Sequence, residues 1–300
     1  MVPVGLTLQP EVEFVELLDE VIRHEVDYYE VAPETLWRAG SDGSLEPNGF
    51  HRRFAALGEE TRRPFVAHGV GLSMGSDCPA DRARRKSWLA RLRQDHRQFR
   101  FRWYTDHLGA TSLDGLALTL PLPLPMNAQA AGVVRRRLAA MQRIVPHVGV
   151  ENNVAYFLLG EPLEEPGFLR AILSRPGMHL LLDVHNLYTM AVNFGFDPED
   201  YLERLDLSRV IEIHLSGGKP SDPAWLPSGR VMRLDSHDAA VPDEVWALFA
   251  KIVPRCRRLK GVTLERMEGT VTRDDVPQIR AELRRARAIV ERHAQVRRSA

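Results

Sequence analysis

Short apolar runs alternate with amphipathic segments along almost the whole chain. A short apolar run has the length of a buried strand, whereas apolar residues spaced three and four apart indicate a helix packed on one face. We therefore expect strands at residues 4–8, 28–32, 64–68, 101–106, 148–151, 179–183, 210–215 and 261–265. We expect helices at residues 14–22, 50–61, 82–98, 127–144, 166–174, 198–205, 242–252 and 274–294.

Eight alternating units in 300 residues favour a (β/α)8 barrel, an α/β fold in which residues 1–300 form one domain. Its core would span residues 4–290, and a short arginine-rich tail would follow. The absence of a Gly-x-Gly-x-x-Gly turn argues against a doubly wound dinucleotide-binding sheet. In a (β/α)8 barrel the C-terminal ends of the strands meet at one mouth, and the loops at residues 69–81 and 109–126 would border it.

Most of the expected strands end on a residue type that binds metals. These residues are His68, Asp106, His107, Glu151, Asp183, His214 and Glu265, and Asn186 follows three positions after Asp183. The triplet Asp235-Ser236-His237 adds an acid and an imidazole. We expect this triplet to be extended, which would point both side chains the same way.

Ordinary structural roles are the alternative for each of these residues. A single histidine is more often a surface or core residue than a ligand, and His179, which opens its strand, would face the other end of the barrel. Arginines such as Arg266 could pair with the acids. Four imidazoles and at least four carboxylates at one mouth are nevertheless difficult to neutralise without cations. About nine nitrogen and oxygen ligands, with no cysteine among them, indicate two or three ions and leave zinc, manganese and iron open.

The charge balance and the cysteines bear on partners and location. The 40 basic and 40 acidic side chains cancel, so nothing in the net charge indicates nucleic acid or a membrane surface as a partner. Cys78 and Cys256 are too few for a disulfide framework. Neither a signal peptide nor a run of ~18 apolar residues stands out. We therefore expect a cytoplasmic protein.

Six longer motifs carry a resemblance to a known family. They are HGVGLSMGS at residues 68–76, ENN at 151–153, LLLDVHNLY at 180–188, IEIHLSGG at 211–218, LDSHD at 234–238 and VWALF at 245–249. In this order they resemble the multinuclear non-heme iron-dependent oxidative enzymes (MNIO), formerly a domain-of-unknown-function family, which modify ribosomally made peptides (RiPP biosynthesis). The likeness runs from residue 4 to residue 288.

The resemblance implies a xylose-isomerase-like barrel with two or three irons, in mixed Fe(II)/Fe(III) states, that uses O2 to oxidise a Cys residue of a precursor peptide. A partner protein that recognises the leader peptide is expected, because the barrel takes up the whole chain. The implied metal ligands are His68, His107, Glu151, Asp183, Asn186, His214, Asp235, His237 and Glu265. The implied catalytic residues are Asp106, Asn152 and His185, and the implied substrate contacts are Glu34 and Ser73.

The chain departs from the family pattern at several positions. Many relatives have a second histidine where Gly218 stands, and an asparagine where His185 precedes Asn186. His185 either replaces the lost ligand or is a hydrogen-bonding neighbour of the site. Relatives also tend to carry Glu-Asn at Glu34-Thr35 and Glu-His at Asp106-His107. These differences bear on the number of ions and on the reaction.

Two other functions use the same ligand types. A tri-zinc site like that of endonuclease IV would cleave phosphodiesters, and a sugar isomerase or epimerase would use a metal to polarise a carbonyl. Residues 82–102 carry nine basic side chains against the acid Asp95. They could follow a phosphate backbone, dock an acidic leader peptide or partner, or form an ordinary solvated helix face. The long motifs favour the iron family, and nucleic acid is not the expected partner.

Overall fold

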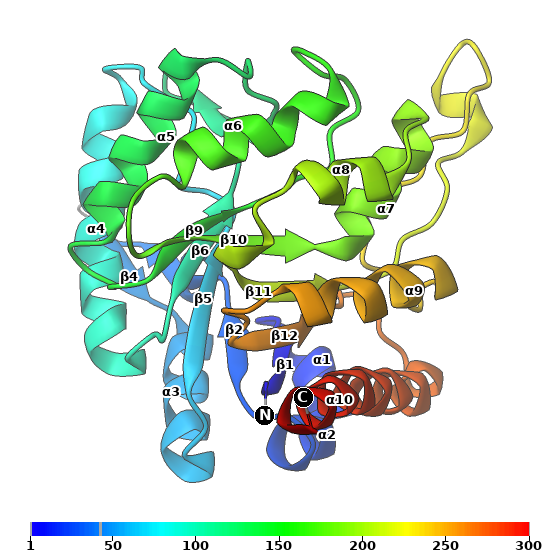
Figure 1. Cartoon of the computed structure of the whole chain (residues 1–300). Coiled ribbons are helices and arrows are strands. Elements are labelled where there is room, and N and C mark those ends of the chain that lie inside the picture. The colour runs from blue at the N-terminus through cyan, green and yellow to red at the C-terminus, as the bar shows by residue number, and fades with distance from the viewer. Residues whose placement is uncertain (1, 42–43, 300) are drawn as a thin grey trace.

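The computed structural model describes residues 2–41 and 44–299, and its centre is a closed barrel of parallel strands surrounded by helices (Figure 1). The barrel strands are β1 (Val4–Thr7), β2 (Tyr29–Val31), β5 (Phe65–Gly69), β6 (Tyr104–His107), β9 (Val148–Glu151), β10 (Met178–Asp183), β11 (Val210–Leu215) and β12 (Gly261–Leu264). They close in the order β1-β12-β11-β10-β9-β6-β5-β2, so strands that follow one another in the chain are neighbours in space. The predicted (β/α)8 barrel is confirmed.

Helices cover the outside of the barrel. They are α1 (Val12–Leu17), α2 (Asp19–His24), α3 (Gly49–Thr61), α4 (Asp81–Phe99), α5 (Ala128–Met141), α6 (Glu165–Ile172), α7 (Val184–Phe194), α8 (Pro198–Arg204), α9 (Asp243–Ile252) and α10 (Val276–Ser299). Short 3-10 turns are η1 (Pro33–Leu36), η2 (Pro162–Glu164), η3 (Leu207–Arg209), η4 (Pro223–Trp225), η5 (Val253–Arg255) and η6 (Arg273–Asp275). No helix in the described part of the chain is long and apolar enough to cross a membrane.

Two helices differ from the expectation. The helix predicted at residues 14–22 is divided at Leu18, whose φ of −102° and ψ of 10° are not helical. Helix α7 was not predicted at all, because its polar stripe (His185, Thr189 and Asn193) is buried and the apolar Val192 is exposed, the reverse of an ordinary surface helix. This helix starts directly after β10 and stands at the mouth.

The loop predicted at residues 109–126 contains a β-hairpin. Strands β7 (Ala110–Leu113) and β8 (Leu116–Leu122) pair antiparallel, and Asp114 and Gly115 form the turn between them with φ of 51° and 80°. An Asp-Gly pair with positive φ at both positions is favoured in two-residue hairpins. A second small hairpin joins β3 (Trp37–Ala39) to β4 (Leu45–Pro47).

The barrel interior is closed below the mouth. Tyr28, Val66, Trp103 and Ile211 form a separate buried apolar cluster there. The fully buried carboxylate of Glu212 lies in this layer and accepts hydrogen bonds from the Tyr28 hydroxyl at 3.1 Å and the Trp103 indole at 2.5 Å. Because this layer is packed and its polar groups are paired, the open polar surface of the interior is confined to the C-terminal ends of the strands.

Candidate metal centre

The structure brings all nine predicted metal ligands together at the mouth. Buried groups of three potential ligands lie with their ligand atoms within 4.8 Å of one another. These groups are His68, Glu151 and His214; Asp183, His237 and Glu265; His185, Asp235 and His237; and Glu30, His214 and Glu265. The groups share His214, His237 and Glu265, so they form one continuous cluster and not four separate sites.

Glu151, the last residue of β9, is the centre of the first group. Its Oε2 lies 3.2 Å from Nε2 of His68 and 3.2 Å from Nε2 of His107. Its Oε1 lies 3.3 Å from the Asn186 side-chain nitrogen and 3.9 Å from Nδ1 of His214. One carboxylate therefore contacts residues from β5, β6, β11 and α7, which is possible only because parallel strands end at the same level.

The imidazoles of His68 and His107 each have a hydrogen-bond partner at the ring nitrogen that faces away from Glu151. His68 Nδ1 lies 3.0 Å from the Thr105 hydroxyl, and His107 Nδ1 donates to the Gly69 carbonyl at 3.2 Å. The second nitrogen, Nε2, then points at Glu151. Such outer hydrogen bonds fix the ring orientation and the tautomer of metal-binding histidines.

Asp183 and Asn186 are positioned by the start of α7. Asp183 ends β10 and caps the helix, because its Oδ1 accepts the backbone N–H of Asn186 at 2.7 Å. The Asn152 side chain forms two hydrogen bonds to the backbone of Asp183: it donates to the carbonyl at 3.0 Å and accepts the N–H at 2.9 Å. Asn152, predicted to be catalytic, thus holds the strand end in this structure.

The triplet Asp235-Ser236-His237 is not extended as predicted. His237 has φ of 50°, in the left-handed region, and the residues form a loop between β11 and α9. The two side chains nevertheless meet, with Asp235 Oδ1 at 2.7 Å from His237 Nε2, while Glu265 Oε1 lies 3.6 Å from His237 Nδ1. The predicted pairing was right and its geometric reason was wrong: a turn, not the strand pleat, brings the two together.

His185 borders this loop at the position where the chain departs from its relatives. A Cβ at Gly218 would lie 2.1 Å from the Leu234 carbonyl oxygen and 3.1 Å from His185 Cε1, so the imidazole packs where a side chain at 218 would begin. The Arg233 guanidinium lies 3.4 Å from His185 Nε2, and Asp235 Oδ1 lies 3.5 Å from Nδ1. Because a guanidinium can only donate, Nε2 is the accepting nitrogen and Nδ1–H faces the Asp235 carboxylate.

Several buried polar atoms at the mouth have no hydrogen-bond partner. They are His68 Nε2, Glu151 Oε2, Asp183 Oδ2, His185 Nδ1, Asn186 Oδ1, Asp235 Oδ1 and both ring nitrogens of His237. Unpaired buried polar atoms are costly, so a concentration of them in one place indicates a missing partner. Apart from the protonated His185 Nδ1, all of them are nitrogen or oxygen atoms that can donate a lone pair. They fit a site for divalent or trivalent cations.

Electrostatics supports the same interpretation. Burial raises the pKa of Glu151 to about 7, and burial together with the nearby Glu151 and Asp235 carboxylates raises the pKa of Asp183 to about 7. Burial alone would lower the pKa of His214, but the Glu30 and Glu265 carboxylates raise it well above its ordinary value. Without cations the cluster must therefore take up protons, and bound cations would release them.

Three further predicted residues lie outside this cluster. The strand pleat turns Asp106 away from its neighbour His107, and its carboxylate accepts from the Tyr104 hydroxyl at 3.0 Å. Glu34 accepts the backbone N–H groups of Val70 at 2.6 Å and Gly71 at 2.8 Å. The Ser73 hydroxyl accepts the N–H groups of Thr111 and Ser112, each at 3.0 Å. Glu34 and Ser73 therefore anchor the loop after β5.

Sequence reasoning missed Glu30, which is fully buried in the middle of β2. Its Oε2 lies 3.0 Å from His214 Nε2, and its Oε1 accepts from the Thr7 hydroxyl at 2.7 Å. An acid inside the apolar run Tyr-Tyr-Glu-Val is itself a signal, since buried carboxylates require a partner. The prediction from strand ends alone does not reach a residue in the middle of a strand.

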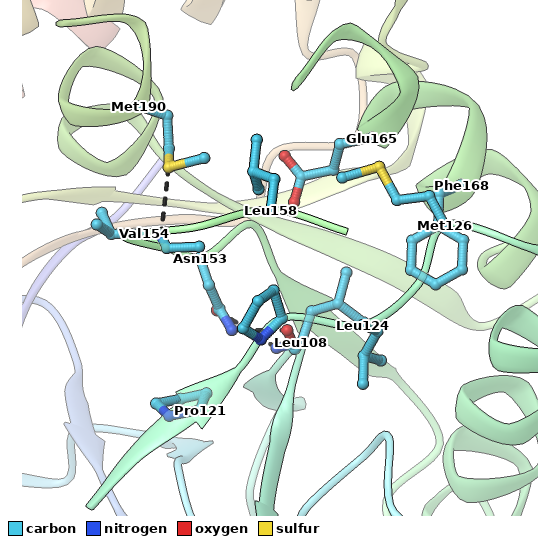
Figure 2. A pocket seen from close by; sticks show the side chains of 12 residues that line it. Leu108, Pro121, Leu124, Met126, Asn153, Val154, Leu158, Glu165, Phe168 and Met190 are labelled. Carbon is cyan, nitrogen blue, oxygen red and sulfur yellow. Dashed lines mark hydrogen bonds between the residues drawn. The ribbon is translucent and has the colours of Figure 1, made fainter. Parts of the chain in front are cut away.

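An apolar pocket is lined in part by residues that closely follow two candidate ligands in the chain (Figure 2). Its cavity is small, about 30 Å³, and is lined by Leu108, Pro121, Pro123, Leu124, Met126, Asn153, Val154, Ala155, Leu158, Glu165, Phe168 and Met190. Leu108 follows His107 directly, and Asn153 lies two residues after Glu151, so the pocket wall begins within about 8 Å of chain length from two candidate ligands. Glu165 points its carboxylate toward this pocket, and burial raises its pKa to about 7.

The basic helix α4 uses part of its charge internally. Arg84 donates to the carbonyls of Gly71 at 2.7 Å and Leu72 at 3.1 Å. Arg91 is buried and forms an ion pair with Asp95. These arginines stabilise the loop after β5 and the helix packing and are not available to follow a phosphate backbone.

A (β/α)8 barrel with imidazoles and carboxylates gathered at its mouth defines a class of metal-dependent enzymes. The model of one family matches residues 3–291, and its description is RiPP precursor modification enzyme MbnB/TglH/ChrH. The chain belongs to this family. It is 35% identical over 249 residues to a UPF0276 protein of Pseudomonas aeruginosa (strain UCBPP-PA14), covering 83% of this chain and 79% of that protein. A UPF0276 protein of Caulobacter vibrioides (strain NA1000 / CB15N) is 34% identical over 247 residues, covering 82% of this chain and 80% of the relative.

Solved structures with the same fold have other functions. A D-psicose 3-epimerase superposes with a TM-score of 0.58 at 13% identity, covering 96% of this chain and 97% of the epimerase. Endonuclease IV from Thermus thermophilus superposes with a TM-score of 0.54 at 17% identity, covering 97% of this chain and 99% of the endonuclease. At these identities the similarity establishes the xylose-isomerase-like fold and nothing about the reaction.

Proposed function

We propose that this protein is an iron-dependent, O2-using oxidase that modifies a Cys residue of a ribosomally made precursor peptide. The observation that carries the proposal is the cluster of unpaired nitrogen and oxygen atoms at the mouth of a barrel from this family. Bound irons would supply one-electron redox chemistry with O2 and a site for a thiolate. The ligand atoms themselves suit zinc and manganese as well, so the choice of iron rests on the family.

The residues divide into two connected ligand groups. His68, His107, Glu151, Asn186 and His214 would hold ions on the β5-β6-β9 side of the mouth, and Asp183, Asp235, His237 and Glu265 would hold them on the β10-β12 side. Glu265 contacts His214 of the first group and His237 of the second and so connects the two, whereas the contacts of Glu151 are to the first group. His185 would donate to Asp235 and orient it, in place of acting as a ligand.

The apolar pocket suits a peptide substrate. Its wall begins beside His107 and Glu151 in the chain, so a peptide whose Cys reaches the metal centre would lay a neighbouring apolar side chain against this wall. Burial raises the pKa of the Glu165 carboxyl to about 7, so this pocket disfavours negative charge and would disfavour an acidic side chain for the same reason. The substrate we infer is a peptide with an apolar residue next to the modified Cys.

Co-expression with the short Cys-containing open reading frame nearest to the gene tests the proposal. The peptide should change in mass in air and remain unchanged when O2 is excluded or iron is chelated. A mass change that is independent of O2 and iron would refute the oxidase assignment. Cleavage of abasic duplex DNA by the zinc-loaded protein would favour the phosphodiesterase alternative instead.

A further inference from the structure

Glu30 and His214 form a carboxylate-imidazole pair behind the metal centre. Both side chains are fully buried, and Glu30 Oε2 lies 3.0 Å from His214 Nε2. The other oxygen of Glu30 accepts the Thr7 hydroxyl at 2.7 Å. Both carboxylate oxygens therefore have partners.

The opposite edge of the same imidazole faces the candidate ligands. His214 Nδ1 lies 3.0 Å from Glu265 Oε2 and 3.9 Å from Glu151 Oε1. The unpaired buried atoms belong to residues on this side, such as Glu151 Oε2 and both ring nitrogens of His237, and none belongs to Glu30. Atoms without partners thus lie on the Nδ1 side of His214, where Nδ1 itself is 3.0 Å from Glu265 Oε2, whereas on the Nε2 side both oxygens of Glu30 are paired.

We propose that Glu30 is a positioning residue that fixes His214 as the Nε2–H tautomer, so that His214 binds its ion through Nδ1. His68 and His107 are held by their Nδ1 atoms and present Nε2, so His214 would be the ligand of opposite orientation among the three. A carboxylate behind a metal-bound imidazole also increases the basicity of the ligand. This inference rests on the metal centre of the proposed function and adds a residue to it.

A geometric reason explains the difference in orientation. His214 is the residue before the last in β11, so it lies inside the barrel, below the strand end. Its ring can therefore reach Glu30, which lies in the middle of β2. His107 ends β6, and its ring is held at the level of the Gly69 carbonyl. A buried carboxylate requires hydrogen-bond donors, and besides the Thr7 hydroxyl the His214 Nε2–H is the group that reaches Glu30.

Zinc binding to the chelator-treated protein tests the inference without substrate, iron or O2. The variants are Glu30→Gln, which keeps an acceptor of equal size without the charge, and Glu30→Ala, which removes the acceptor. Glu212→Gln is the matched control, because Glu212 is equally buried, lies 4.0 Å from His214 Nε2 and is occupied by Tyr28, Trp103 and Thr263. Circular dichroism checks that each variant is folded.

We expect one zinc per chain to bind about 10–100-fold more weakly in the Glu30 variants, with Ala worse than Gln, and the control to bind like the wild type. Ring 15N–1H correlation spectra of the zinc-loaded wild type should show His214 protonated at Nε2. A proton on Nδ1, metal on Nε2, or unchanged zinc affinity in Glu30→Ala would overturn the inference. If the wild type itself binds no metal, the proposed function fails first, so the two failures are distinguishable.

Discussion

Replacement of Glu151 by Gln should raise the thermal stability of the metal-free protein and lower the stabilisation that bound metal gives. Glu151 is 1% exposed and lies 3.2 Å from the Nε2 atoms of His68 and His107. In the metal-free protein, burial raises its pKa from 4.5 to about 7. The folded state then favours the protonated acid, and the protein loses stability as the pH rises from 4.5 through 7.

The size of the effect follows from the shift. Each pKa unit corresponds to about 1.4 kcal/mol, so ionised Glu151 costs the metal-free protein roughly 3 kcal/mol above pH 7. Glu151→Gln removes this cost, and a chain of this size gains about 2–3 °C in Tm per kcal/mol. The metal-free variant should therefore melt about 6–9 °C above the metal-free wild type at about pH 8, and close to it near pH 4.

Metal should reverse this order. A hundredfold excess of zinc over its Kd stabilises a folded protein by about 2.7 kcal/mol per site, and the variant lacks the carboxylate around which one site is built. Thermal unfolding followed by circular dichroism, with chelator and then with zinc, measures both effects. Equal stabilisation of wild type and variant by zinc would show that Glu151 is not a ligand and would refute the reasoning.

Three further changes probe other parts of the site. His185→Ala should leave the number of bound zinc ions unchanged in zinc titrations and weaken the binding of one of them about 10–100-fold, with His179→Ala as control. Loss of a whole ion would make His185 a ligand. Leu158→Trp, which fills the apolar pocket, should reduce modification of the precursor peptide measured by mass spectrometry. The control Leu159→Trp, at the exposed neighbouring position, should not. Equal rates in the two variants would exclude the pocket from substrate binding. Burial raises the pKa of Glu165 to about 7, so Glu165→Gln should stabilise the protein at about pH 8 by about 2 kcal/mol and not at about pH 4, as denaturant unfolding would show.

The barrel and most of the candidate ligands were predictable because both depend on local patterns. Buried strands of a parallel barrel appear as short apolar runs, and the residue that closes such a run must lie at the mouth. Glu151, Asp183 and Glu265 could be assigned on this basis. Glu30 could not, since its role depends on the depth at which the His214 ring lies, and this depth follows from the stagger of neighbouring strands.

The outer parts of the site were less predictable for a different reason. Asp106 ends an apolar run as the ligands do, but the strand pleat turns it away from the mouth. Ser73 lies in a family motif, but its hydroxyl binds the backbone of the β7-β8 hairpin. This hairpin was not predicted, because the sequence at residues 109–126 is rich in proline. Side-chain direction and loop anchoring are set by tertiary contacts, and a linear pattern carries little information about them.

Metal analysis of the protein purified without added metal tests the central claim most directly. An iron oxidase of this family should hold two or three irons per chain, with both Fe(II) and Fe(III) in the Mössbauer spectrum, and Glu151→Gln should lose this iron. Zinc alone at near-stoichiometric occupancy, with no activity restored by iron, would contradict it.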